Sequence, residues 1–214
     1  IFPIYYGAIF RSKGVEEISM KGLSMWYRNN LNLVFREQWK SITKTEYPYL
    51  NTSDRKSTGF IAVFDPYFDR YILHKKDYEL SQEIMDNIKS IPNDNIYTPL
   101  DYYFDNDRIY QATDVDTLRE LNYEDDEQVI NKSFTISYSL ENKVWASFHS
   151  YRPNHMWNDN YTFYTSINNP SYSDYTWKHN VRNFQTYYDT KFDFIYDYVA
   201  KGAEPIMTKA FETI

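Results

Sequence analysis

The chain has 214 residues, of which 20% are aromatic and 23 are tyrosines, with no cysteine and a formal net charge of −7. The lack of cysteine excludes a disulfide framework, thiolate metal ligands and cysteine nucleophiles. The acidic balance argues against nucleic acid as the main partner, because phosphate binding needs clustered Lys and Arg.

The first residues, IFPIYYGAIF, lack an initiator Met and have the composition of a strand already in progress. We therefore expect residues 1–214 to form a single structural module that is a fragment of a larger polypeptide. No stretch approaches the roughly 18 consecutive apolar residues that a membrane helix requires, so no membrane span is predicted.

From Leu23 to Ile42 the apolar residues recur at intervals of three and four, which predicts one prominent amphipathic helix over residues 23–42. Two runs rich in aromatic and β-branched residues follow on either side of Asp65 and Pro66, so a hairpin is expected over residues 60–74. Ser81 then precedes a short apolar period and is the expected N-cap of a second, shorter helix.

The segment from residue 92 to residue 129 is acidic, with the stretches DYYFDNDR and NYEDDEQ, and its periodicity is weak. Loops and short strands are expected there, and the segment is a candidate surface insertion.

Residues 133–149 predict the clearest β-hairpin. Two runs of alternating apolar and polar residues are separated by Glu141, Asn142 and Lys143. A three-residue loop at this point sets Leu140 opposite Val144 and gives the hairpin one apolar face. That face is expected to hold Phe134, Ile136, Tyr138, Val144, Ala146 and Phe148, and the other face to hold Thr135, Ser137, Ser139, Trp145, His149 and Tyr151. A charge should accordingly be far better tolerated at Ser137 than at Ile136.

Further strands are expected in NYTFYTSI and KFDFIYDYV, and a short helix near Ala210 and Phe211. The fold class predicted from the whole pattern is mainly β with a few helices, or α+β. Antiparallel hairpins are expected to form a sandwich or a propeller-like assembly of sheets.

Candidate reactive groups are sparse. The histidines His149, His155 and His179 have no recognised metal-ligand spacing, so they are interpreted as structural and no metal or cofactor is predicted. Carboxylates that could form a glycan-cleaving pair occur at Asp65, Asp69, Asp101, Asp105 and Asp107, although acids in turns more often cap backbone amides. No catalytic residue is assigned.

The order of four stretches along the chain is the basis of a family resemblance. The stretches are SMKGLSMWYRNNL, TGFIAVFDPYFDRYILHKKDY, SFTISYSLENKVWASFHSYRPNHMW and KHNVRNFQTYYDTKFDFIYDYV. Together they resemble the muzzle-like large tail proteins of crAss-like bacteriophages of gut Bacteroidales. The resemblance implies a virion structural component, present in several copies around the tail axis and located in the phage tail, with no catalytic residue.

The resulting functional prediction is a non-enzymatic tail component that contacts copies of itself and other tail proteins. Its abundant tyrosines suit large interfaces. The candidate interface residues, available to a neighbouring protein or to a second layer of the fold, are Trp145, His149, Tyr151, Arg152 and Trp157. Two alternatives remain open: a carbohydrate-binding module for a host surface glycan, and a glycan-cleaving enzyme.

Overall fold

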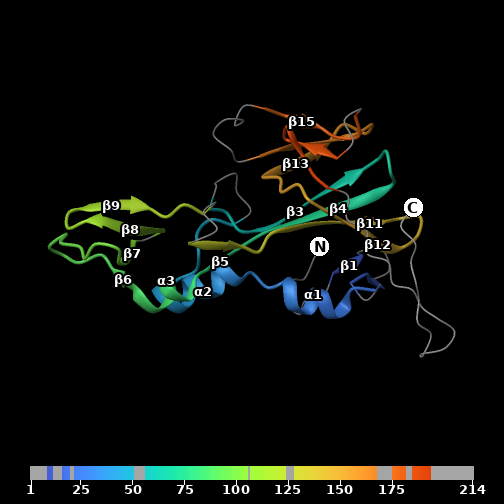
Figure 1. Cartoon of the computed structure of the whole chain (residues 1–214). Helices are drawn as coiled ribbons and strands as arrows, with labels where there is room; N and C mark the ends of the chain where they lie inside the picture. The colour runs from blue at the N-terminus through green and yellow to red at the C-terminus, as the bar shows by residue number, and fades with distance from the viewer. Residues whose placement is uncertain are drawn as a thin grey trace, which may run out of the picture. The chain divides into compact units, whose positions relative to one another are not determined.

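The computed structural model describes residues 9–11, 16–19, 22–50, 56–105, 107–123, 128–167, 175–181 and 185–193. The chain divides into two compact units, residues 1–182 and 183–214. The described part is mostly β with several open antiparallel sheets, which confirms the predicted α+β class (Figure 1). No described helix is long and apolar enough to cross a membrane.

A four-stranded antiparallel sheet forms the centre of the first unit. In sheet order its strands are β12 (Val144–His149), β11 (Phe134–Ser139), β4 (Arg70–Lys76) and β3 (Gly59–Asp65). Strands β3 and β4 form the hairpin predicted around Asp65 and Pro66. The Asp65 carboxylate accepts the backbone N–H of Tyr67 and so stabilises the turn.

Two helices replace the single helix predicted over residues 23–42. Helix α1 (Ser24–Asn30) and helix α2 (Val34–Thr43) are separated by Leu31–Leu33. Figure 1 shows α1 beneath the central sheet, where Tyr27 and Leu31 pack against Leu73 and Ile136. The predicted helical segment is therefore present but bent, because tertiary contacts take over the hydrogen bonds at the break.

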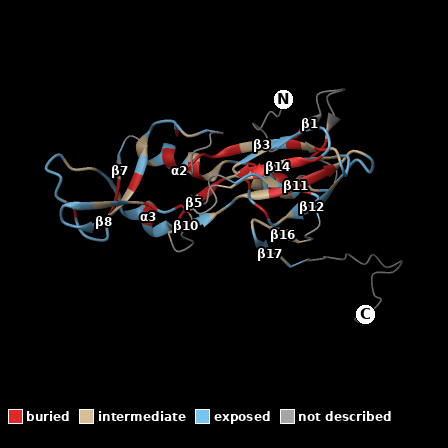
Figure 2. Ribbon diagram, turned by 90° about the horizontal axis from the view of Figure 1, so that it is seen from above, coloured by how far each residue is buried: buried red, intermediate tan, exposed pale blue. Residues whose placement is uncertain are grey.

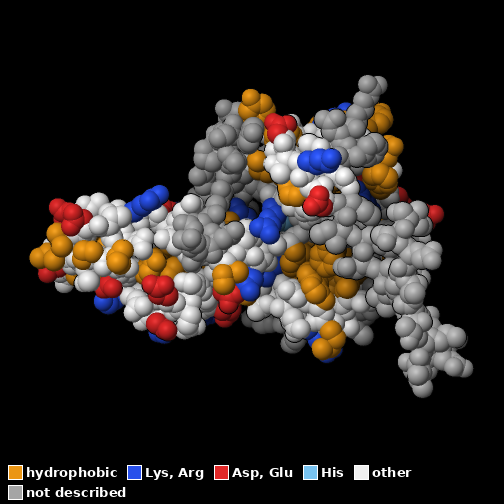
Figure 3. All heavy atoms as spheres, viewed as in Figure 1, with side chains coloured by type: hydrophobic (Ala, Val, Ile, Leu, Met, Phe, Trp, Pro, Cys, Tyr) orange, Lys and Arg blue, Asp and Glu red, His pale blue; other side chains and the backbone are white. Residues whose placement is uncertain are grey.

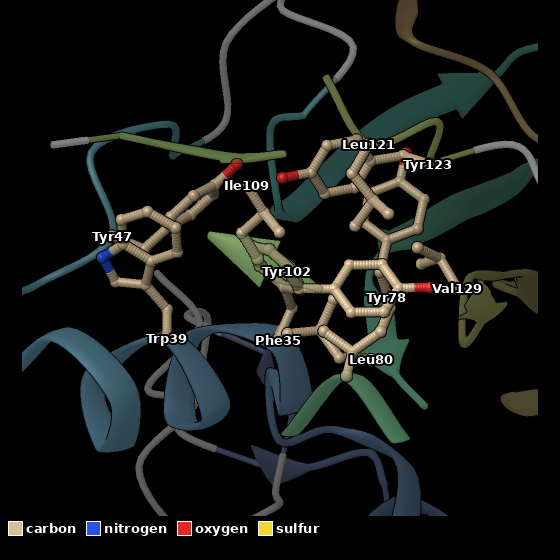
Figure 4. Close-up of a cluster of buried hydrophobic side chains, with 11 residues drawn as sticks. Phe35, Trp39, Tyr47, Tyr78, Leu80, Tyr102, Ile109, Leu121, Tyr123 and Val129 are labelled. Carbon is tan, nitrogen blue, oxygen red and sulfur yellow. The ribbon is translucent and has the colours of Figure 1, made fainter. Parts of the chain in front are cut away.

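The largest apolar cluster lies between α2 and strands that follow the β3–β4 hairpin in the chain. It includes β5 (Tyr78–Leu80), its antiparallel partner β10 (Val129–Asn131) and α3 (Gln82–Asn87). Figure 4 shows Phe35 and Trp39 rising from α2 towards the rings of Tyr47, Tyr78 and Tyr102. Ser81 caps α3 as predicted, since its Oγ accepts the backbone N–H of Ile84.

A second four-stranded sheet takes three of its strands from the acidic segment. Its strands are β6 (Ile88–Ser90), β7 (Tyr102–Asp105), β8 (Arg108–Asp114) and β9 (Thr117–Glu120). Strands β6 and β7 are parallel and the other pairs antiparallel. A small cluster of Tyr97, Tyr103 and Ala112 supports this sheet, so much of residues 92–129 is regular β-structure.

A third sheet covers the face of the central sheet opposite α1. It consists of β13 (His155–Asn158), β14 (Phe163–Ser166) and β15 (Trp177–Lys178). The Asn158 side-chain amide donates to the Phe64 carbonyl, which ties β13 to β3 at 2.8 Å. Figure 2 shows buried residues along β11 and β14, so both faces of the central sheet are covered in part.

Short antiparallel pairs complete the described structure. Strands β1 (Phe10–Arg11) and β2 (Glu16–Glu17) pair near the start, and β16 (Thr186–Tyr187) pairs with β17 (Thr190–Lys191) in the second unit. The predicted strand in NYTFYTSI corresponds to β14. The predicted helix near Ala210 and Phe211, and KFDFIYDYV beyond residue 193, lie outside the described residues.

Candidate functional site: the central hairpin and the faces beside it

The β11–β12 hairpin keeps the predicted register over half of its length. Thr135, Ile136 and Ser137 lie opposite His149, Phe148 and Ser147. A β-bulge then shifts the pairing, so that Tyr138 faces Trp145 and Ser139 faces Val144. One extra residue on a strand turns the following side chains to the other face. Trp145 and Val144, which lie between the bulge and the loop, therefore have the opposite faces to those predicted.

Trp145 consequently lies on the α1 face, where the sequence analysis did not place it. Its Nε1 donates to the Ile18 carbonyl at 2.9 Å. Its ring centroid lies 5.0 Å from that of Tyr27 and 5.2 Å from that of Tyr138. In the described chain Trp145 is thus occupied in packing and hydrogen bonding beside α1.

His149 and Tyr151 lie, as predicted, on the hairpin's other face, beneath the β13–β15 sheet. The ring centroids are 5.1 Å apart for His149 and Tyr151, and 4.9 Å apart for Tyr151 and His179. His179 in turn stacks on Phe163 at 4.2 Å with nearly parallel planes. We call these four residues, His149, Tyr151, Phe163 and His179, the interlayer seam. His149 and Tyr151 were expected to face either a neighbouring protein or a second layer of the fold, and here they face a second layer.

The histidines on this face are held neutral by their surroundings. Burial lowers the pKa of His149 to about 3, with Arg70 and His179 adding electrostatic repulsion. Burial, assisted by Arg70, lowers the pKa of His179 to about 4. His74, on β4, has a pKa of about 3 because it is buried and close to Lys76 and Arg152. A low dielectric and nearby cations both disfavour imidazolium.

Polar contacts join the two layers around the seam. The Thr135 hydroxyl lies 2.9 Å from His74 Nδ1 and donates to the Tyr151 carbonyl at 2.5 Å. Lys76 Nζ donates to the Asn154 side chain at 2.9 Å. These bonds satisfy groups that would otherwise be costly to bury, so the polar face of β11 is an interior surface.

An apolar surface runs along β12, which is an edge strand of the central sheet. Phe148 is 55% exposed and Val144 is 42% exposed, although both were expected in the core. The Phe148 ring packs edge-on against Trp26 of α1 at 4.9 Å. We call Trp26 and Phe148, which lie together on the α1 face, the edge patch; Val144 is opposite Ser139 beyond the bulge and faces the other side of the sheet. Because the Phe148 ring is largely exposed on an edge strand of the described sheet, the patch is a candidate contact surface.

A second aromatic surface lies on the outer face of the β13–β15 sheet. Trp157, which is 41% exposed, is directly opposite Tyr164, and their rings are nearly parallel at 6.0 Å. Asp159 accepts the Tyr164 hydroxyl at 2.7 Å and two backbone N–H groups, which lower the pKa of Asp159 to about 2. Tyr161 is nearby in sequence and 83% exposed.

Of the remaining sequence-predicted interface residues, Arg152 is exposed, whereas Tyr151 is only 2% exposed. Tyr151 therefore contributes to packing between the layers. Trp157 is the one ring of the predicted set that presents a large exposed surface.

Acidic residues dominate the β6–β9 region. Between residues 82 and 121 the chain has nine Asp or Glu and three Lys or Arg, which gives −6 of the total −7. Exposed apolar side chains lie among them, namely Ile96, Leu100 and Val115. In Figure 3 apolar and acidic side chains alternate over this sheet, at the left of the view.

Three of the five carboxylates singled out in the sequence, Asp65, Asp101 and Asp107, are engaged in structural contacts. Asp65 is fully buried and binds Arg70 Nε at 2.9 Å and the Asn180 amide at 2.9 Å. Asp101 pairs with Lys89, and Asp107 accepts the Tyr49 hydroxyl. Within the described ranges no group of three potential ligands is placed to hold a metal ion.

Comparisons with known proteins gave no match: no family model, no curated protein and no solved structure is similar to this chain at a significant level.

Several residues of these surfaces were not assigned from the sequence. Tyr164 and Asp159 lie on a predicted strand and its preceding turn, but nothing local indicated that they face Trp157. His179 is a lone histidine in sequence, and only the pairing of β15 with β14 brings it beneath Tyr151. The clustering of three of the four histidines on one sheet face depends on contacts between distant segments.

Proposed function

We propose that this protein is a structural component of a bacteriophage tail, similar to the muzzle proteins, and acts without catalysis through contacts with copies of itself and with other tail proteins. The support is the ordered sequence resemblance together with the surface chemistry. The acidic β6–β9 region and the exposed aromatic surfaces suit protein contacts, and they offer no phosphate-binding surface.

The observation that carries the proposal is the edge patch on β12. An edge strand presents backbone N–H and C=O groups on one side, and natural proteins usually protect such an edge with charges. Here the strand instead carries the exposed Phe148 ring, which packs against Trp26 on the α1 face. A neighbouring chain that extends the sheet, or packs on these rings, would remove apolar surface from water.

The experiment measures the mass of the full chain in solution by light scattering after size-exclusion chromatography. We expect concentration-dependent self-association that Phe148→Ser weakens at least tenfold. Tyr161→Ser, which removes a still more exposed ring from the turn between β13 and β14, is the control and should leave the association constant unchanged. A monomer at all concentrations, or equal weakening by both variants, would remove the edge patch as the contact surface.

The location in the virion needs a separate measurement. Peptide mass spectrometry of purified phage particles should recover peptides of this chain in constant ratio to other tail proteins. Particles that lack these peptides, from a culture that expresses the chain, would refute a tail component even if the purified protein self-associates.

Carbohydrate recognition remains a second candidate because of the Trp157 and Tyr164 pair. Exposed aromatic rings can pack on the apolar face of a sugar, and Asp159 holds the Tyr164 ring in place. On a glycan array, Trp157→Ala should abolish any signal while Phe148→Ser retains it. A uniformly negative array with folded protein would exclude this candidate.

A further inference from the structure

The interlayer seam brings two imidazoles from different layers to one buried aromatic ring. His149 ends β12 of the central sheet, and His179 follows β15 of the covering sheet. The Tyr151 ring contacts both, at centroid distances of 5.1 and 4.9 Å. The attachment of the β13–β15 sheet at this point therefore depends on two side chains that can each take up a proton.

In the closed arrangement one ring nitrogen of His149 could not pair its proton in the imidazolium form. Its Nε2 is buried and has no hydrogen-bond partner among the described residues. Protonation would create a buried N–H donor without an acceptor, which is costly in addition to the buried charge. His179 differs, because its Nε2 lies 2.8 Å from the Thr165 hydroxyl, but it too is largely enclosed by Phe163 and Tyr151.

The charged groups that face these histidines oppose protonation. Arg70 of β4 acts on both His149 and His179, and the two histidines repel each other when charged. Lys76 and Arg152 act in the same way on His74, which lies on the same face. The buried carboxylate of this region, Asp65, is already bound to Arg70 and Asn180. Charge on the seam is thus destabilising from both layers.

We propose that the interlayer seam is an acid-sensitive latch: when its histidines take up protons, the β13–β15 sheet separates from the central sheet and uncovers its aromatic inner face. This face includes Phe163 and, opposite Thr165 in the strand pairing, Trp177. The latch does not depend on the proposed tail function, because it follows from the packing within this chain alone.

The direction of the pH dependence follows from the proton uptake on opening. An exposed histidine has a pKa of about 6.5, whereas the closed seam holds the pKa of His149 at about 3 and that of His179 at about 4. The closed form is therefore favoured above pH ~6.5 and loses stability as the pH falls towards these lower values. Each histidine changes the opening constant by about tenfold per pH unit, so two give about a hundredfold.

The five tryptophans allow opening to be distinguished from unfolding. In full-length protein labelled with 5-fluorotryptophan, Trp177 and Trp157 report on the β13–β15 sheet, Trp39 on the core beside α2, and Trp145 on the α1 face. Single Trp→Phe variants assign the fluorine resonances. Between pH 7 and pH 4 we expect the Trp177 signal to move to a solvent-exposed position while those of Trp39 and Trp145 stay unchanged.

Two variants test the role of the seam. His149→Phe keeps a ring without a titrating group, and the slope of the logarithm of the opening constant against pH should fall by about one. His155→Phe is the matched control, because His155 is exposed on β13 and should leave the slope unchanged. A direct measurement on the unaltered protein is the pKa of His149 from its ring Cε1–H resonance, expected below about 5 even if a variant fails to fold.

Three results would overturn the latch. The first is a Trp177 resonance that does not move down to pH 4. The second is simultaneous movement of all tryptophan signals, which indicates global acid unfolding. The third is a His149 that titrates near the pKa of an exposed histidine.

Discussion

Lys75 and Asp77, two residues apart in the chain, bind the two sides of the break between α1 and α2. Lys75 Nζ donates to the carbonyls of Asn30 and Asn32, and the Asp77 carboxylate accepts the backbone N–H groups of Val34 and Phe35. In a continuous helix the N–H of Val34 would donate to the carbonyl of Asn30. The buried pair, 2.7 Å apart, supplies a new partner to each of these two groups.

Asp77→Asn should therefore be among the most destabilising substitutions in the chain. It leaves Lys75 charged in a buried site and weakens the cap of α2, for an expected loss of about 3 to 5 kcal/mol in the free energy of unfolding. Urea denaturation followed by circular dichroism gives the value. Glu79→Gln, which removes a more exposed partner of Lys132, should cost less than about 1 kcal/mol. Similar losses for the two variants would contradict the role given to Asp77.

The two faces of β11 should be equally intolerant of charge. Ile136 packs beside α1, and Ser137 is fully buried beneath the covering sheet. We expect Ile136→Asp and Ser137→Asp each to cost more than about 4 kcal/mol, because both bury an unpaired carboxylate. Ser147→Asp, on the exposed edge strand opposite Ser137, should be mild. A folded Ser137→Asp protein of near-normal stability would show that the covering sheet does not close over this position.

The hydrogen bond of Trp145 predicts a smaller effect. Trp145→Phe keeps a ring beside Tyr27 but removes the Nε1 donor to the Ile18 carbonyl, so a loss of about 1 kcal/mol is expected. Trp157→Phe, on the outer surface, should stay within about 0.5 kcal/mol. The two denaturation midpoints are compared: if Trp145→Phe costs no more than Trp157→Phe, the hydrogen bond of Trp145 to Ile18, and with it the bulge that turns Trp145 towards α1, is contradicted.

The cap of α3 is a local feature with a local test. Ser81→Ala should reduce stability by about 1 kcal/mol, because the backbone N–H of Ile84 loses its acceptor. Ser90→Ala, at an exposed position on β6, should change the free energy of unfolding by less than about 0.5 kcal/mol. Equal changes would mean that Ser81 does not act as the cap in solution.

The features that were predicted correctly from the sequence are those that depend on interactions between residues close together in the chain. The hairpin around Pro66, the cap at Ser81 and the strand alternation of β11 each follow from residues a few positions apart, and the structure contains all three. The break between α1 and α2 could not be predicted in this way, because it depends on Asp77, more than 40 residues further along the chain.

The candidate surfaces show the same limit. A strand with hydroxyl side chains on one face is typical of a half-exposed sheet, so Ser137 was expected near solvent. It is buried because β13–β15, which follow later in the chain, cover that face. Conversely, Phe148 was assigned to the core by alternation, yet β12 is an edge strand and leaves the ring largely uncovered.

The uneven distribution of charge has a kinetic consequence. Because residues 82–121 carry −6 of the net −7, the rest of the chain is nearly neutral in sum and the net negative charge is concentrated around the β6–β9 sheet. A partner with a basic surface would be attracted to the β6–β9 end first, so the molecule would be oriented before any contact forms. Such steering acts on the association rate, and it weakens as added salt shortens the range of the field.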